Sequence, residues 1–162
     1  MNSTAPCCEI HAAKCELAAE VLRTSGKLHL QVTGWSMLPS VWPGDTLIIN
    51  RVASDEVVAG DIILFGRDRR LFAHRIVESN GAEGFVTHGD SMRNVDTPVA
   101  KEELLGKVSF IVRDGRCIEP RTTPRFAERV VAALVRRSDT AARVVVGVHG
   151  LRRRSQVQTK QD

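Results

Sequence analysis

The alternation of apolar and polar residues changes period twice along the chain. Residues 9–25 carry apolar side chains at helical spacing, and Gly26 follows where a C-terminal cap is expected. The inner face predicted for this helix consists of Ile10, Ala13, Leu17 and Val21. From Lys27 to Thr33 the period is two, which is typical of a half-buried strand.

Between residue 27 and about residue 120, short apolar runs alternate with turn residues. After the first strand, further strands are predicted at Thr46–Val52, Asp61–Phe65, Leu71–Glu78, Gly84–His88, Lys107–Arg113 and 116–118. Asn80-Gly81 and Asp114-Gly115 are typical hairpin turns between neighbouring strands of this series. We therefore expect a mainly β fold that is flanked by helices on both sides.

A second helical part is predicted after the β domain. It begins near Thr123 and Pro124, with the threonine as cap and the proline in the first turn. Apolar residues then recur at four-residue steps, at Phe126, Val130 and Leu134. The Val-rich run at 141–148 fits either a helix or a strand. Three parts are thus predicted: an N-terminal helix at 1–26, a β domain at 27–120 and a basic helical tail at 121–162.

The formal net charge of +4 is distributed unevenly along the chain. Residues 121–162 contain ten Lys and Arg against three Asp and Glu, whereas residues 1–120 contain 13 basic and 16 acidic residues. A basic tail favours an anionic partner, so we expect either an ordinary solvated surface or contact with an anionic membrane. Aromatic residues make up only 4% of the chain, with no Tyr, so no nucleic-acid partner is expected.

No apolar segment of the sequence is long enough to cross a membrane. The longest unbroken apolar run, Val130–Val135, has six residues, whereas a spanning helix needs about 20. The first twenty residues include four charged side chains and lack the apolar core of a secretion signal. We expect a cytoplasmic protein, with a peripheral position at the inner face of the cell membrane as the alternative.

The four cysteines, Cys7, Cys8, Cys15 and Cys117, are expected to be reduced thiols, because no export signal is present. Cys8, His11 and Cys15 are spaced so that they would share one face of the first helix, which is one requirement of a zinc site. Because the sequence contains no C-x-x-C pair, a metal-free protein is favoured over a zinc protein.

Three short segments contain the residue types of nucleophilic catalysis. Ser36 follows the first predicted strand, His74 lies within a later one, and Asp90 and Asp96 follow the strand predicted at 84–88. A serine hydroxyl becomes an effective nucleophile when a base accepts its proton, and an imidazole, whose ordinary pKa is about 6.5, can do so at neutral pH. A carboxylate bound to the other ring nitrogen holds the imidazole in the required tautomer. Singly, these residues are typical of turns and packed cores, but together they supply a nucleophile, a base and an orienting carboxylate.

The sequence around these residues resembles the serine peptidases of the signal-peptidase and LexA superfamily. Five motifs, in order, carry the resemblance: GWSMLP at 34–39 with PGD at 43–45, GDII at 60–63, AHRIV at 73–77, THGD at 87–90 with Asp96, and GKV at 106–108. They are similar to the successive motifs of type I signal peptidases and cover about residues 30–112. His74 stands where bacterial signal peptidases have Lys, as in the archaeal and endoplasmic-reticulum branch.

This resemblance implies a fold of coiled β-strands and hydrolysis of peptide bonds after small residues. It implies Ser36 as the nucleophile and His74 as its general base, with Asp96, or else Asp90, as the carboxylate that orients His74. The backbone N–H of Ser36 would contribute to the oxyanion hole, and no metal or organic cofactor is implied. Unlike signal peptidases, the sequence shows no membrane anchor, and its last motif lacks the Asn-Asn pair and the paired Asp.

Four residues beside the nucleophile are candidates for contact with an apolar substrate: Trp35, Met37, Leu38 and Pro39. Packing within the core is the alternative for this apolar cluster.

The function favoured by the motifs is that of a serine endopeptidase that processes leader or signal-like peptides. One alternative is a self-cleaving regulator like LexA and UmuD, which use a Ser–Lys pair on the same fold. Another is a non-catalytic module of this fold that binds peptide or lipid. The expected partner is therefore a peptide or preprotein substrate, with an anionic membrane surface as a second partner of the basic tail.

Overall fold

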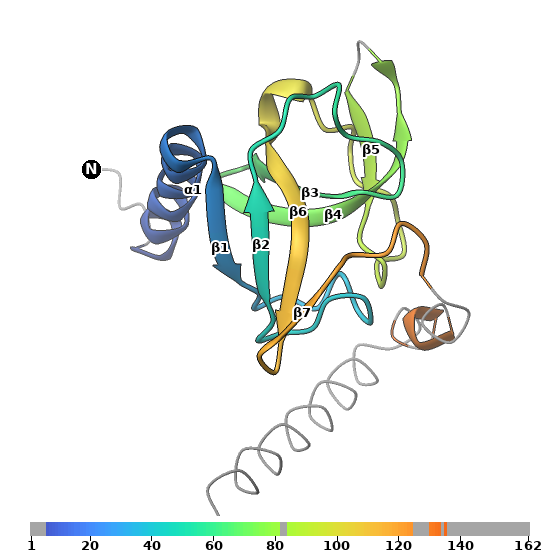
Figure 1. Ribbon diagram of the computed structural model, residues 1–162. Helices are drawn as coiled ribbons and strands as arrows, with labels where there is room; N and C mark the ends of the chain where they lie inside the picture. Colours follow the sequence, from blue (N-terminus) through green and yellow to red (C-terminus); the bar gives the residue numbers. More distant parts are fainter. Residues whose placement is uncertain (1–5, 82–83, 125–129, 134, 136–162) are drawn as a thin grey trace, which may run out of the picture.

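The computed structural model describes residues 6–81, 84–124, 130–133 and 135, with side chains from His11 onward, and consists mainly of β-strands (Figure 1). The described strands form one antiparallel sheet in the order β1-β2-β6-β3-β4-β5, and β7 pairs with β6. Its elements are α1 (Pro6–Ser25), β1 (Lys27–Gln31), β2 (Thr46–Asn50), β3 (Ile62–Arg67), β4 (Arg70–Ser79), β5 (Phe85–His88), a 3₁₀ turn η2 (Lys101–Glu103), β6 (Leu104–Arg113) and β7 (Arg116–Ile118). The predicted mainly β fold with an N-terminal helix is confirmed.

Both hairpins predicted from turn residues are present. Asn80-Gly81 begins the loop between β4 and β5, and Asp114-Gly115, both with positive φ, connects β6 to β7. A third hairpin, between β3 and β4, was not predicted. Its turn consists of Asp68 and Arg69, whose φ angles of 50° and 59° are those of a turn that usually contains Asn-Gly. Arg gives no sequence signal for this conformation, because side chains other than Gly, Asn and Asp rarely adopt it.

The strand β6 lies at the centre of the sheet and pairs with β2, β3 and β7. The ladder between β2 and β6 shifts register at Ile48 and Ile49. Next to this bulge, a Cβ on Gly106 would lie 2.5 Å from the carbonyl oxygen of Asn50, so only glycine allows the two strands to approach this closely.

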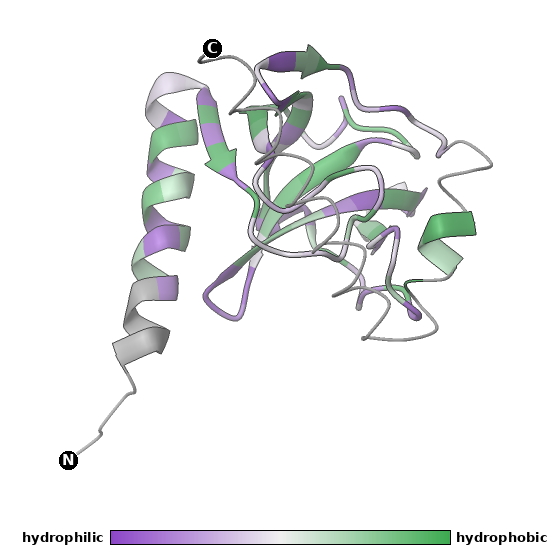
Figure 2. Cartoon of the chain, turned by 90° about the horizontal axis from the view of Figure 1, so that it is seen from below, coloured by the Kyte–Doolittle hydropathy of each residue, from purple (hydrophilic) through white to green (hydrophobic). Residues whose placement is uncertain are grey.

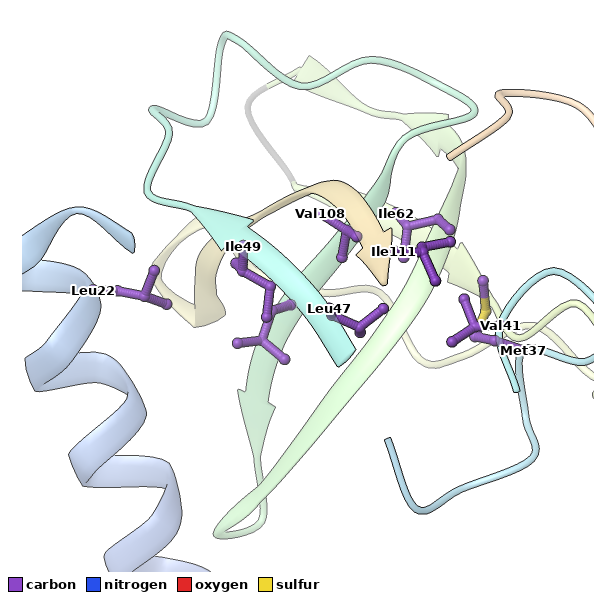
Figure 3. Close-up of a cluster of buried hydrophobic side chains, with 9 residues drawn as sticks. Leu22, Met37, Val41, Leu47, Ile49, Ile62, Val108 and Ile111 are labelled. Carbon is purple, nitrogen blue, oxygen red and sulfur yellow. The ribbon is translucent and has the colours of Figure 1, made fainter. Parts of the chain in front are cut away.

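Apolar residues from alternate positions of β3 fill two separate clusters. The first contains Ile62 and Leu64 together with Leu22 of α1 and residues of β2 and β6, as Figure 3 shows. The second contains Ile63 and Phe65 and closes the opposite face of the strand. In Figure 3, Leu22 lies at one end of the first cluster, whereas Met37 and Val41 lie at the other. The helix α1 and the segment after β1 thus contact the same core from opposite ends.

The inner face of α1 differs from the prediction. Leu17 is 64% exposed, whereas Ala18 and Leu22 are buried. The prediction placed Leu17 and Val21 on the inner face, but Ala18 and Leu22, one residue later, occupy it. Cys15 on the same face lies close to the sheet, since a Cβ on Gly66 would be 2.9 Å from its Sγ. The helix is therefore turned by about one residue, or about 100°, from the predicted orientation.

The helical part predicted after the β domain is described only in part. Residues 130–133 and 135 are helical, whereas the run at 141–148 and most of the basic tail lie outside the described residues. Within the described part of the chain, no helix has both the length and the hydropathy that crossing a membrane requires.

The different burial of two leucines on α1 gives a test of this packing. Leu22→Ala should lower the free energy of unfolding by about 2–4 kcal/mol, because it leaves a cavity in the first cluster. Leu17→Ala, on the exposed face of the same helix, should change it by less than about 0.5 kcal/mol. Denaturant unfolding of the two variants and the parent measures both values. Equal losses in the two variants would show that α1 is oriented differently.

Candidate active site

Three segments that are distant in sequence meet around the imidazole of His74. Ser36 lies in the turn that follows the extended residues after β1, His74 lies within β4, and Asp96 lies in the loop after β5. Nε2 of His74 is 2.9 Å from Oγ of Ser36, and Nδ1 is 2.6 Å from Oδ2 of Asp96. Because an ionised carboxylate can only accept, Nδ1 carries the proton and Nε2 is free to accept one from the hydroxyl. The sequence-predicted residues Ser36, His74 and Asp96 thus form one continuous chain of hydrogen bonds.

Asp96 is fixed at its backbone and at its side chain by the same neighbour. Oγ1 of Thr87 donates to Oδ2 of Asp96 at 2.7 Å, and the backbone N–H of Asp96 donates to the carbonyl of Thr87 at 2.9 Å. Thr87 is fully buried in β5. No function was assigned to it from the sequence, although it begins the THGD motif.

The surroundings of Asp96 keep its carboxyl group ionised. Burial alone would raise the pKa of Asp96, but the hydrogen bonds from His74 and Thr87, together with the nearby imidazoles of His74 and His88, lower it below its ordinary value. While Asp96 is ionised, it accepts from Nδ1 of His74 and so fixes the tautomer of the neutral imidazole.

The second predicted carboxylate, Asp90, binds elsewhere. Nε and Nη2 of Arg75 both donate to the Asp90 carboxylate at 2.9 Å, and Ser40 donates to it as well. The Arg75 and Asp90 side chains are only 8% and 6% exposed. Since Arg75 directly follows His74 on β4, the two neighbouring residues bind two different aspartates, and the geometry at His74 favours Asp96.

The loop that carries Ser36 is held by its backbone. The N–H of Ser91 donates to the carbonyl of Ser36 at 2.9 Å, and Oγ of Ser91 donates to the carbonyl of Trp35 at 2.8 Å. In the part of the chain that the structure describes, no hydrogen bond uses the backbone N–H of Ser36. That group is therefore available to a ligand beside the hydroxyl.

The predicted substrate contacts need a correction. Of the four candidates, Trp35 is exposed at 38%, whereas Met37, Leu38 and Pro39 are buried. Met37 packs into the first core cluster, and Leu38 is completely inaccessible. The core-packing alternative therefore holds for these three residues, because a short loop of apolar residues is fixed most effectively by burying them.

Two exposed apolar residues near the site were missed by the sequence analysis. Met92 is 40% exposed and Val95 is 58% exposed, and Val95 directly precedes Asp96. Met92 lies near the imidazole, because a Cβ on Gly89 would be 2.6 Å from Cγ of Met92 and 3.1 Å from Nε2 of His74. Trp35, which directly precedes Ser36, is the third exposed apolar residue beside the catalytic groups, and we call Trp35, Met92 and Val95 the site rim.

The described residues give no indication of a metal site. Among them, no three His, Cys, Asp or Glu side chains lie together in a suitable arrangement. Cys15 and Cys117 are free thiols, and burial, with a contribution from Glu16, raises the pKa of Cys15. The side chains of Cys7 and Cys8 lie outside the described residues, so the absence of metal remains a prediction.

Comparison with known proteins identifies one family. A family model described as Peptidase S24-like matches residues 5–109. The match includes α1, most of β6 and the segments of Ser36, His74 and Asp96, and it ends before β7 and the C-terminal segment. No curated protein matches the chain.

Gly89 gives a test of how tightly the site is packed. In Gly89→Ala, the new Cβ would lie 2.8 Å from the carbonyl oxygen of Ser36 and 3.1 Å from Nε2 of His74, so the two groups must move apart. A displacement of roughly half an ångström is expected to slow the reaction of Ser36 with a fluorophosphonate probe about tenfold, since a full 1 Å costs about 100-fold. Gly34→Ala is the matched control, because a Cβ there has no neighbour within 4 Å. Equal labelling rates for both variants and the parent would contradict this geometry.

Proposed function

Because this chain belongs to the Peptidase S24-like family, we propose that it is a serine endopeptidase in which Ser36 is the nucleophile and His74 the general base. The observation that supports this most directly is the chain of hydrogen bonds from Ser36 through His74 to Asp96, at 2.9 and 2.6 Å. Both distances are within the range required of a nucleophile, its base and the group that orients the base.

The reaction follows from this arrangement. Oγ of Ser36 attacks the carbonyl carbon of the peptide while Nε2 of His74 takes the hydroxyl proton. Asp96 stabilises the resulting imidazolium through Nδ1 without taking its proton. The imidazolium then donates the proton to the leaving amine as the C–N bond breaks. A water molecule, activated by the same imidazole, hydrolyses the acyl-enzyme and restores the Ser36 hydroxyl.

The backbone N–H of Ser36 would stabilise the negative charge that develops on the carbonyl oxygen. It belongs to the attacking residue itself, so it lies close to the reacting carbon throughout the step, and it donates to no other described residue. The hydrogen bonds from Ser91 to Ser36 and Trp35 hold this part of the backbone in place.

The finer placement within the superfamily rests on His74. A histidine at this position is similar to the archaeal and endoplasmic-reticulum signal peptidases, whereas the bacterial enzymes and LexA-type regulators use lysine. Among the described residues, a carboxylate lies directly behind the imidazole, an arrangement that a histidine base needs and a lysine base does not. We propose that this protein belongs to the histidine branch.

The site rim suggests the class of substrate. Trp35, Met92 and Val95 present apolar surface around the reacting groups, at 38%, 40% and 58% exposure. Exposed apolar residues that surround a reactive centre favour a substrate with apolar side chains near the bond that is cut. Leader and signal-like peptides have this character, and we propose them as the substrates.

A self-cleaving regulator is the second candidate, and the family match favours it because LexA and UmuD share this fold. Such a protein needs a segment of its own that reaches the nucleophile. In Figure 3, Leu22 of α1 lies at the opposite end of the core cluster from Met37, which directly follows Ser36. Cleavage within α1 by the same molecule is therefore disfavoured, and an external peptide is favoured over α1 as the substrate.

The proposed location and second partner depend on the tail. Its excess of seven positive charges over residues 121–162 favours an anionic membrane surface as a second partner. Most of this tail lies outside the described residues, so its contact with lipid remains a proposal from charge.

The catalytic roles can be tested by substitution. Ser36→Ala should abolish hydrolysis of a leader-like peptide, and Asp96→Asn should lower turnover about 10⁴-fold, because the amide no longer fixes the tautomer of His74. Protonation of Asp96 should not limit turnover until the pH falls below the ordinary range of an aspartate, because its pKa is lowered. Steady-state kinetics between about pH 4 and pH 8 should therefore show no loss of turnover from this carboxylate, and they also measure the effect of the two substitutions.

Asp90→Asn is the comparison variant, because it changes the other candidate carboxylate. It should lower the thermal midpoint by leaving Arg75 without its partner, and lower turnover less than Asp96→Asn does. A larger loss of turnover in Asp90→Asn, with both variants folded, would exchange the two assignments. An intact-mass spectrum showing two fragments after incubation of the parent alone would favour self-cleavage.

The site rim gives a test of substrate class. Met92→Asp should lower kcat/KM about tenfold, mainly through KM, for peptides with apolar residues near the cut. Leu17→Asp, at an exposed leucine on α1, should leave both constants unchanged. Equal kinetics of Met92→Asp and the parent on such peptides would argue against the rim as a substrate contact.

A further inference from the structure

The nucleophile loop, residues 36–41, is buried from two sides. Met37 and Val41 point into the first core cluster, as Figure 3 shows. Leu38 belongs to a separate cluster, in which its buried partner is Val135 of the C-terminal helix, with Trp42 and Val131 packed against them. Successive residues of the loop are therefore held by different parts of the chain.

The contact between Leu38 and the C-terminal helix is buried from solvent. Leu38 is 0% exposed and Val135 is 6% exposed. Ala132, one turn before Val135, is also buried, whereas Val130 on the other side of the helix is 45% exposed. Figure 2 shows that the described residues of this helix are hydrophobic. Since Leu38 is two residues from Ser36, the helix supports the loop close to its reactive hydroxyl.

The chain that leads to this helix is fixed by Arg75, the residue after His74. Nη1 of Arg75 donates to the carbonyl of Arg121 at 2.5 Å and to that of Gly60 at 2.9 Å. Nη2 donates to Oγ of Ser40 at 3.3 Å and to Asp90. One buried guanidinium therefore connects the strand of His74, the nucleophile loop and residues 121–122.

The close approach of this segment also requires a glycine. A Cβ on Gly60 would lie 2.9 Å from both Cβ and the carbonyl oxygen of Thr122. The segment lies outside the part of the chain that matches the family, which ends at residue 109. The family match alone therefore gives no reason to expect support for Ser36 from this region.

We propose that residues 120–124, 130–133 and 135, which we call the C-terminal strap, position the nucleophile loop, and that Val135 and Arg75 are positioning residues for Ser36. This proposal rests on the proposed peptidase function. On this proposal, the part of the basic tail that begins at Arg121 serves the chemistry in addition to any contact with an anionic membrane. The described beginning of that tail contacts the loop of Ser36 and the strand of His74.

Two substitutions on one helix test the proposal in the full chain. Val135→Asp places a charge against Leu38, whereas Val130→Asp, the matched control, places it on the exposed face. In Val135→Asp, labelling of Ser36 by a fluorophosphonate should slow about 100-fold, and kcat should fall with little change in KM. Val130→Asp should react like the parent, and Val135→Ile should keep most of the parent's rate.

Hydrogen exchange gives a readout that does not depend on activity. The amides of Leu38 and Val41, which donate to the carbonyls of Trp35 and Met37, should exchange about tenfold faster in Val135→Asp than in the parent, while those of β2 and β6 stay protected. Val135→Ala should also speed exchange in the loop, by a smaller factor. This variant replaces Val135→Asp in the experiment if the aspartate variant does not fold. Unchanged exchange in the loop of both Val135 variants, or equal changes in Val130→Asp, would overturn the proposal. If Ser36 of the parent protein is not labelled by the fluorophosphonate, the proposed peptidase function is contradicted. The hydrogen-exchange comparison would still test whether the strap holds the nucleophile loop.

Discussion

The hydrogen bond between Nδ1 of His74 and the carboxylate of Asp96 joins the middle of β4 to the loop after β5. Both groups are removed from most of the solvent, at 5% and 22% side-chain exposure, so each needs a partner. Thr87 completes the hydrogen bonding of the carboxylate from within β5. Pairing of β4 with β5 therefore brings the carboxylate and the imidazole together, and the tautomer of the imidazole follows from that pairing.

Two buried ion pairs hold the loop of Ser36 against this centre. Asp90 binds Arg75 on one side, and Asp45, which is fully buried, binds Arg113 on the other. Arg113 also donates to the carbonyl of Ser40 at 3.0 Å, and Arg75 donates to its hydroxyl, so Ser40 accepts hydrogen bonds from both arginines. Buried ion pairs contribute little net stability, because desolvation offsets their attraction, but they strongly disfavour arrangements that leave one partner alone. A loop in another position would therefore lose the hydrogen bonds that both arginines make to Ser40.

Much of the fold follows from local signals. The period-two runs and the Asn80-Gly81 and Asp114-Gly115 turns predicted the strands and two hairpins, because backbone geometry requires those residue types there. The turn at Asp68 and Arg69 gave no such signal, since tertiary pairing of β3 and β4 imposes its conformation. The face of α1 was also mispredicted, because apolar residues lie on two adjoining faces of this helix and only its packing on the sheet buries Ala18 and Leu22 instead of Leu17.

The sequence by itself determined which residue types could act together: a serine, a histidine and two aspartates in motifs of recognisable order. It left the choice of aspartate open, because spacing along the chain does not determine which carboxylate reaches a ring nitrogen. Tertiary structure placed Asp96 on His74 and Asp90 on Arg75, since neighbouring residues of a strand reach different surroundings. It also decided that Leu38 packs on Val135, about a hundred residues away, because burial is a property of the folded chain and not of local sequence.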